Sequence, residues 1–119
     1  MFAFSGVLVH TKESSVGETV HLQCEDNYTS NSSLIDWFYQ PQLSAKPVRI
    51  VSSGHLINVD RGHRLTINGT TLTLKNINLI DRGIYTCVVH DIVYVHVRRK
   101  YRIRLVVNGN FLRHMRAFE

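Results

Sequence analysis

The residues of this 119-residue chain that could carry chemistry are seven histidines, two cysteines and a run of cations near the C-terminus. The histidines lack the H-x-x-x-H or H-x-H spacing of a metal site; they are His10, His21, His55, His63, His90, His96 and His114. Only His90 and His96 could approach each other, across a hairpin. The cysteines form no C-x-x-C pair and show no zinc-ligand spacing. We therefore expect no metal and no cofactor.

Catalytic patterns are also missing from the sequence. It contains no serine-centred nucleophile elbow and no glycine-rich phosphate loop, and no carboxylate pair stands where a cleft would be expected. We therefore expect a binding protein and not an enzyme.

The basic run carries most of the charge information. It consists of Arg98, Arg99, Lys100, Arg102 and Arg104, in a chain of net charge +5 and pI about 9.6. Such a cluster favours an anionic partner: a sulfated glycan, acidic lipid head groups or an acidic protein surface. The alternative is a solvent-facing strand whose charges protect a sheet edge from aggregation.

Cys24 and Cys87 stand 63 positions apart, with Trp37 between them and the run Asp81-Arg-Gly-Ile-Tyr85-Thr-Cys87 at the end. This pattern resembles the core signature of the immunoglobulin superfamily, V-set type. The resemblance implies an all-β fold, a two-sheet Greek-key sandwich of V-type with one inter-sheet disulfide between Cys24 and Cys87. Trp37 would pack against that bridge, and the Tyr85 hydroxyl would bond back to the backbone of the corner before it.

Arg64 and Asp81 match, by the same resemblance, the arginine–aspartate pair of V-type domains. The alternative is two surface charges that contribute little to stability.

The length corresponds to one domain, which we place at 1–107, with 108–119 as a tail, a stalk or an added segment. No apolar run approaches the roughly 20 residues of a transmembrane helix, and the first residues do not read as a signal peptide. We expect a fragment of a longer precursor with an added Met1. Membrane attachment would then come only from a segment outside this chain.

Three sequons and the cysteine pair indicate an extracellular chain, either a receptor ectodomain or a secreted protein. The sequons begin at Asn27, Asn31 and Asn68. The dipeptide Asn68-Gly69 also predicts a two-residue hairpin turn in which both residues have positive φ. In this setting we do not expect a nucleic-acid partner.

Short strands separated by turn residues are predicted along the chain. They cover 6–10, 20–24, 34–40, 47–51, 54–59, 64–67, 70–74, 83–90 and 100–107, with a turn at 13–19. Fifty positions separate Trp37 from Cys87, which accommodates the extra strands of the nine-strand V-type arrangement. An intermediate I-type domain is the alternative. Residues 91–98 would either lengthen the last hairpin or form an exposed apolar tip.

Strand alternation predicts which side chains face outward. Ile35, Trp37 and Tyr39 should point into the core, and Asp36, Phe38 and Gln40 away from it. The predicted partner-binding residues combine aromatic, apolar and arginine side chains, a composition enriched at interfaces; they are Phe38, Gln40, Arg49, Val88, Arg102 and Arg104.

Gln40 follows the tryptophan by three residues, and in antibody-like V-type domains a glutamine at this place meets its counterpart in a second copy. By this resemblance, Phe38 and Gln40 are predicted contacts of a homodimer. Arginines would repel across its axis unless Asp36 or Asp91 of the partner paired with them.

Two binding functions follow, beside a third reading in which the domain is purely structural and spaces other domains. The first is an extracellular recognition domain of an immune or adhesion receptor, which binds a protein partner, itself included. The alternative is an innate recognition module that binds anionic glycans or microbial surfaces through residues 98–104.

Overall fold

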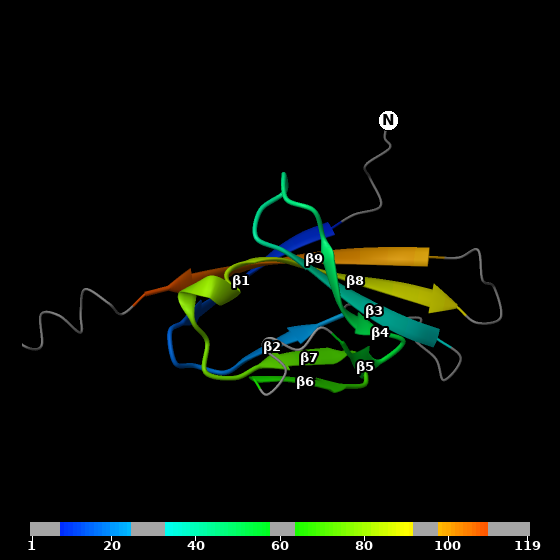
Figure 1. Cartoon of the computed structure of the whole chain (residues 1–119), viewed down its shortest axis with the longest axis horizontal. Helices are drawn as coiled ribbons and strands as arrows, with labels where there is room; N and C mark the ends of the chain where they lie inside the picture. Colours follow the sequence, from blue (N-terminus) through cyan, green and yellow to red (C-terminus); the bar gives the residue numbers. More distant parts are fainter. Residues whose placement is uncertain (1–7, 25–32, 58–63, 92–97, 110–119) are drawn as a thin grey trace, which may run out of the picture.

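The computed structural model describes residues 8–24, 33–57, 64–91 and 98–109, which form two stacked β-sheets (Figure 1). The elements are β1 (Leu8–Ser15), β2 (Val20–Gln23), β3 (Ser33–Gln40), β4 (Val48–Ser52), β5 (His55–Leu56), β6 (Leu65–Asn68), β7 (Thr71–Leu74), the 3₁₀ turn η3 (Leu79–Asp81), β8 (Gly83–Asp91) and β9 (Arg98–Asn108). In this part of the chain no helix is long and apolar enough to cross a membrane.

The two sheets have the V-type arrangement. The larger sheet has the order β1-β9-β8-β3-β4-β5 and the smaller has the order β2-β7-β6. β1 runs parallel to β9, whereas the other pairs are antiparallel. The expected all-β sandwich is therefore confirmed. We call the side of the six-stranded sheet that is turned away from the smaller sheet the outer face.

The disulfide and the tryptophan occupy the centre of the core, as the resemblance implied. Cys24 and Cys87 are bonded, with their Cα atoms 6.0 Å apart. Trp37 pairs with Cys87 across β3 and β8 and is completely buried. Inward-facing side chains of both sheets, such as Leu22, Leu72 and Leu105, complete the cluster. The alternation of β2, β7 and β9 produces this core because every second side chain points inward.

The corner before β8 is tied together by Tyr85, Asp81 and Arg64. The Tyr85 hydroxyl donates a 2.6 Å hydrogen bond to the carbonyl oxygen of Asp81. The fully buried Asp81 carboxylate accepts two hydrogen bonds from Arg64, of 2.8 and 3.0 Å. These bonds raise the pKa of Arg64, although its partial burial opposes the shift. The pair is therefore a buried structural contact, and the alternative of two surface charges is wrong.

Gly83 of the same motif is required for space and for backbone conformation. Its φ is 145°, a value that residues with a side chain rarely adopt. A Cβ at this position would lie 2.6 Å from the carbonyl oxygen of Gln40 and 2.8 Å from Cε1 of Tyr39. The Tyr39 hydroxyl in turn donates to the carbonyl oxygen of Arg82 at 2.6 Å. The close approach of β8 to β3 therefore depends on a glycine at position 83, because any side chain there would collide with β3.

Most predicted strands agree with the structure to within two residues at each end, and three predicted features differ more clearly. β1 continues through Ser15, into the predicted turn at 13–19, because its residues pair with β9 as far as Asn108. The hairpin between β6 and β7 turns on Gly69 and Thr70, and only Gly69 has positive φ, at 59°. Asn68 is the last strand residue, so its predicted role in the turn is wrong. β5 is shorter than predicted, and residues 58–63 lie outside the described part.

Candidate functional site

The register of four strands places the predicted contact residues in rows across the outer face. Phe38 of β3 pairs with Arg49 of β4 on one side and Thr86 of β8 on the other, and Thr86 pairs with Arg102 of β9. These four side chains form one row across the sheet, because cross-strand partners point to the same side. The pairing of the strands therefore brings together residues that lie far apart in the sequence.

At one end of this row, Arg49 and Phe38 contact each other. The guanidinium carbon of Arg49 lies 5.1 Å from the centre of the Phe38 ring, a cation–π geometry. The Phe38 side chain is half-buried and that of Arg49 is 50% exposed. The ring is therefore partly covered by its own chain, and an aromatic and cationic surface remains open.

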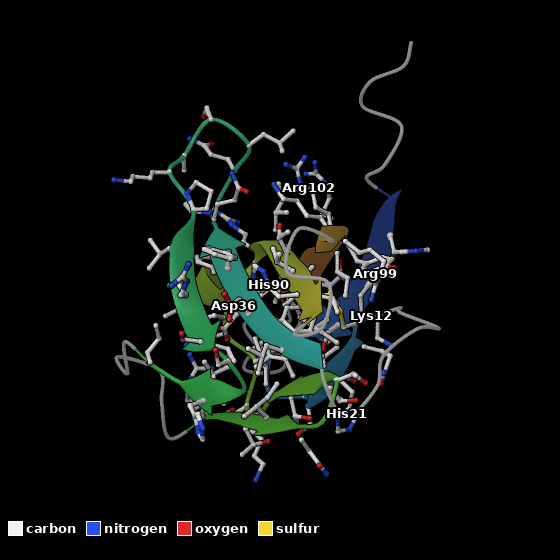
Figure 2. The ribbon with its side chains drawn as sticks, turned by 90° about the vertical axis from the view of Figure 1, so that its right-hand side faces the viewer. Lys12, His21, Asp36, His90, Arg99 and Arg102 are labelled. Atoms are coloured by element: carbon white, nitrogen blue, oxygen red, sulfur yellow. A yellow bond between two sulfur atoms is a disulfide. The ribbon has the colours of Figure 1, made fainter. Side chains whose placement is uncertain are left out.

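Asp36 lies on the same face but is buried, which corrects the expectation that it is free for a partner. One carboxylate oxygen accepts a 2.7 Å hydrogen bond from the backbone N–H of Ser53. The other lies 3.4 Å from Nε2 of His90 and 3.9 Å from Nε of Arg49. Figure 2 shows Asp36 and His90 together over the sheet. One of the two carboxylates that could have offset arginines of a second copy is therefore already used within the chain, and the side chain of the other, Asp91, lies outside the described residues.

Gln40 is also buried, with 5% of its surface exposed, so the prediction of an open contact residue is wrong for this side chain. Its amide nitrogen lies 3.1, 3.3 and 3.0 Å from the carbonyl oxygens of Gln42, Leu43 and Ala45. The side chain thereby holds the loop at 41–47, which projects above the outer face (Figure 1). Gln40 shapes the neighbouring surface and does not itself present a donor outward.

A hollow of about 180 Å³ lies between this loop and β9; we call it the outer-face hollow. Its lining residues are Phe38, Gln40, Pro47, Thr86, Val88, Lys100 and Arg102. Val88, predicted as an exposed contact, is only 4% exposed because the surrounding side chains cover it. Val88 and Thr86 therefore lie beneath the contact surface, and Lys100 and Arg102 form its cationic side.

The basic run is divided by the pleat of β9. Lys100, Arg102 and Arg104 alternate onto the outer face, whereas Arg99 pairs with the core residue Val89 and lies on the opposite side. The side chain of Arg98 lies outside the described residues. Figure 2 shows Arg99 and Arg102 well separated. The basic run of the sequence is thus divided in the structure: Lys100, Arg102 and Arg104 form a row on the outer face, and Arg99 lies on the other side of the sheet.

A second basic site lies at the edge between β1 and β2. His10, Lys12 and His21 line a hollow of about 150 Å³ there, together with Thr11, Leu22, Gln23 and Ile103. The ring of His21 is already hydrogen-bonded, with Nδ1 at 2.8 Å from the hydroxyl of Thr73. Within the described residues, no group of three or more His, Cys, Asp or Glu could hold a metal ion. His96 lies outside them, so its predicted approach to His90 stays a prediction.

Of the three sequon asparagines, Asn68 is exposed at the end of β6, in the smaller sheet. Asn27 and Asn31 fall outside the described part of the chain. A glycan at Asn68 would leave the outer face open, because that face belongs to the other sheet.

Asp36 and the loop at 41–47 are the parts of the site that alternation missed. Alternation assigns a side of the sheet but not the neighbours that cover a side chain. Ser53 and His90 reach Asp36 from other strands. The sequence did contain one signal for the burial of Asp36. It is the single carboxylate among the outward positions of the predicted sheet, and a charge that becomes covered there needs a partner.

A comparison with protein families agrees with this geometry. The family model of the immunoglobulin V-set domain matches residues 10–108. No curated protein matches the chain.

Proposed function

Because this chain belongs to the V-set family of immunoglobulin domains, we propose that it is an extracellular recognition domain that binds a protein partner through the outer face. Domains of this family are typically recognition modules without enzymatic activity, and they generally mediate contacts between proteins. The family and the fold support a role in recognition, and the side chains of the outer face support this face as the binding surface.

The observation that carries the proposal is the outer-face hollow with Phe38 at its border. Interfaces concentrate aromatic and arginine side chains around partly desolvated pockets. Here a half-buried ring lies between Arg49 and a hollow flanked by Lys100 and Arg102. Val88 and Thr86 make the base of this surface nearly inaccessible to water, which favours packing against an inserted side chain.

An extracellular location is supported by the disulfide and by the exposed sequon at Asn68. We propose an ectodomain or a secreted domain of an immune or adhesion protein. The fully buried disulfide would persist in an oxidising compartment and stabilise the domain there.

The second candidate function is binding of an anionic glycan through β9. The specific observation in its favour is that Lys100, Arg102 and Arg104 share one face. Arg99 lies on the opposite side, so the row is shorter than the sequence run predicted.

The test is a binding screen of the tetramerised domain against cells that each display one known ectodomain. Binding to a displayed protein should be lost with Phe38→Ala and weakened with Arg49→Ala. Lys75→Ala serves as the control, because Lys75 is an exposed cation beyond the end of β7 in the other sheet.

Equal binding by all the variants would refute the outer-face assignment. Binding that disappears with heparinase treatment of the cells, and that Lys100→Ala weakens more than Phe38→Ala, would support the glycan function instead.

A further inference from the structure

Arg102 is a residue of the outer face with a buried side-chain nitrogen that lacks a hydrogen-bond acceptor among the described residues. Its side chain is half-buried, and its Nε atom is buried without a hydrogen-bond partner among the described residues. A buried N–H of a charged group that lacks an acceptor is costly to the folded protein. Arg104, two residues further along the same face, is exposed. A ligand acceptor would therefore satisfy a buried N–H at Arg102, whereas at Arg104 it would only replace water.

The acceptor is best supplied from the outer-face hollow, which Arg102 lines. Because Nε is covered in the free domain, the guanidinium has to turn toward the hollow to offer this N–H to a ligand. No described acceptor holds Nε in place. A carboxylate suits this group, since it accepts two parallel hydrogen bonds from a guanidinium.

The hollow also has room for an apolar group beside the carboxylate. Its volume is about 180 Å³, and a cavity of roughly 150 Å³ is enough for benzene. Phe38, Pro47 and Val88 supply apolar walls, and Lys100 adds a second cation next to Arg102. This combination matches an acidic side chain with an apolar neighbour better than it matches a sulfated sugar, which would leave the apolar walls unused.

The charges of the face argue against a second copy as the occupant. Among the described residues, the outer face holds two carboxylates: Asp36, which is engaged by Ser53, His90 and Arg49, and Glu13 of β1, which pairs with Val106 of β9. A two-fold dimer would place the same patch on both sides. Lys100 and Arg102 would then meet like charges across the axis, and the exposed Glu13 lies beside Val106, outside the lining of the hollow, which disfavours association.

We infer that Arg102 is the anchor for an acidic side chain of a different protein, whose apolar neighbour enters the outer-face hollow against Phe38 and Val88. This inference rests on the proposed function, because it assumes that the outer face binds protein. It adds the chemistry of the partner and favours a different protein over a second copy of this chain.

The test uses the ¹⁵N-labelled whole chain and a small probe, 3-phenylpropionate, with its neutral amide as the matched ligand. The Nε–H signal of Arg102 is directly observable by NMR and reports on the atom in question. The acid should shift this signal together with the backbone signals of Phe38 and Val88, with Kd on the order of 1–10 mM, as expected for a ligand of this size. The amide should bind at least about tenfold more weakly, because it lacks the charge-assisted hydrogen bonds.

Arg104→Gln is the control for Arg102→Gln, because both arginines lie on the same face of β9. Arg102→Gln should abolish the shifts at Phe38, whereas Arg104→Gln should retain them within about twofold in Kd. Dispersion of the amide spectrum establishes that each variant is folded. Arg102→Lys, which keeps the charge without the planar fork, should weaken binding of the acid by about tenfold.

Three outcomes would overturn the inference. The acid could leave the Arg102 signal unmoved in the folded protein. A heparin disaccharide could instead shift Lys100, Arg102 and Arg104 together while the acid does nothing, which would assign the face to glycans. Dilution of the free domain could shift the same signals, which would assign it to a second copy. If the acid fails while Phe38→Ala still abolishes binding to a displayed protein, the proposed function stands and only the acidic anchor is lost.

Discussion

Replacing Arg64 by methionine should show how strongly the corner before β8 depends on one ion pair. The change removes both hydrogen bonds from Arg64 to the Asp81 carboxylate and leaves the aliphatic packing similar in volume. The fully buried Asp81 carboxylate would keep the backbone N–H of Asn78, at 2.7 Å, as a donor but would lose its charged partner.

The expected cost is about 3 kcal/mol. Breaking a buried pair by removing one partner costs roughly 3–5 kcal/mol, because the other charge stays buried and uncompensated. We take the lower end because the Arg64 side chain is 17% exposed, so water can approach the Asp81 carboxylate after the change. For a domain of this size the loss corresponds to about 12 °C in Tm.

Urea denaturation followed by tryptophan fluorescence is the appropriate assay, because the single tryptophan, Trp37, is buried in the core. The midpoint should fall by about 1–3 M in the Arg64→Met variant. Arg82→Met is the control: Arg82 is an exposed arginine of the same corner, and the change should stay within about 0.5 kcal/mol. In a double-mutant cycle with Asp81→Asn, the coupling should be about 1–3 kcal/mol.

The direction of the Arg64 pKa shift predicts how the stability cost of Arg64→Met depends on pH. A pKa that is raised in the folded state contributes stability that is complete below the ordinary value and is lost only as pH rises through the raised one. The contribution of Arg64 should therefore be the same at about pH 6 and pH 9. A cost below about 0.5 kcal/mol, typical of an exposed pair, would refute the reasoning.

Gly83→Ala should destabilise the domain by at least about 2 kcal/mol, since positive φ and steric overlap each cost about 1–3 kcal/mol, and thermal unfolding by circular dichroism would measure this. Tyr85→Phe should cost about 1–3 kcal/mol by leaving the carbonyl of Asp81 without its buried donor; a loss below 0.5 kcal/mol in urea titrations, on the order of a surface change, would contradict it. Reduction of the disulfide should cost about 2–5 kcal/mol, which unfolding with and without reductant would reveal. Light scattering after gel filtration should give a monomer at low and high salt, and a dimer would contradict the charge argument against self-association.

The sequence predicted the core well because its determinants are local. The motif from Asp81 to Cys87 places a tyrosine and a cysteine at fixed offsets, and the structure uses both as the resemblance implied. The role of Gly83 in the same motif was found in the structure. The inward alternation of β2, β7 and β9 follows directly from residue types two positions apart. The strands and their inward sides could therefore be predicted without knowledge of their pairing, whereas their division between two sheets was implied by the resemblance.

Features set by distant segments could not be predicted in this way. The end of β1 depends on parallel pairing with β9, more than ninety residues later in the sequence. The burial of Asp36 depends on Ser53 and His90, and that of Gln40 on carbonyl oxygens of its own loop. Alternation gives the face of a side chain, whereas its accessibility is decided by neighbours that only the folded structure brings together.

The parallel pairing of β1 with β9 has a mechanical consequence. The ladder joins Leu8 to Tyr101 at one end and Ser15 to Asn108 at the other, with both strands running in the same direction. Tension applied to the N-terminal end of β1 and the C-terminal end of β9 pulls the two strands past each other. The hydrogen bonds of the ladder then carry the force together in shear and do not open one at a time. Behind this ladder, the Cys24–Cys87 bond limits how far the intervening chain can extend. A domain built this way can keep its outer face intact when its two ends are pulled apart.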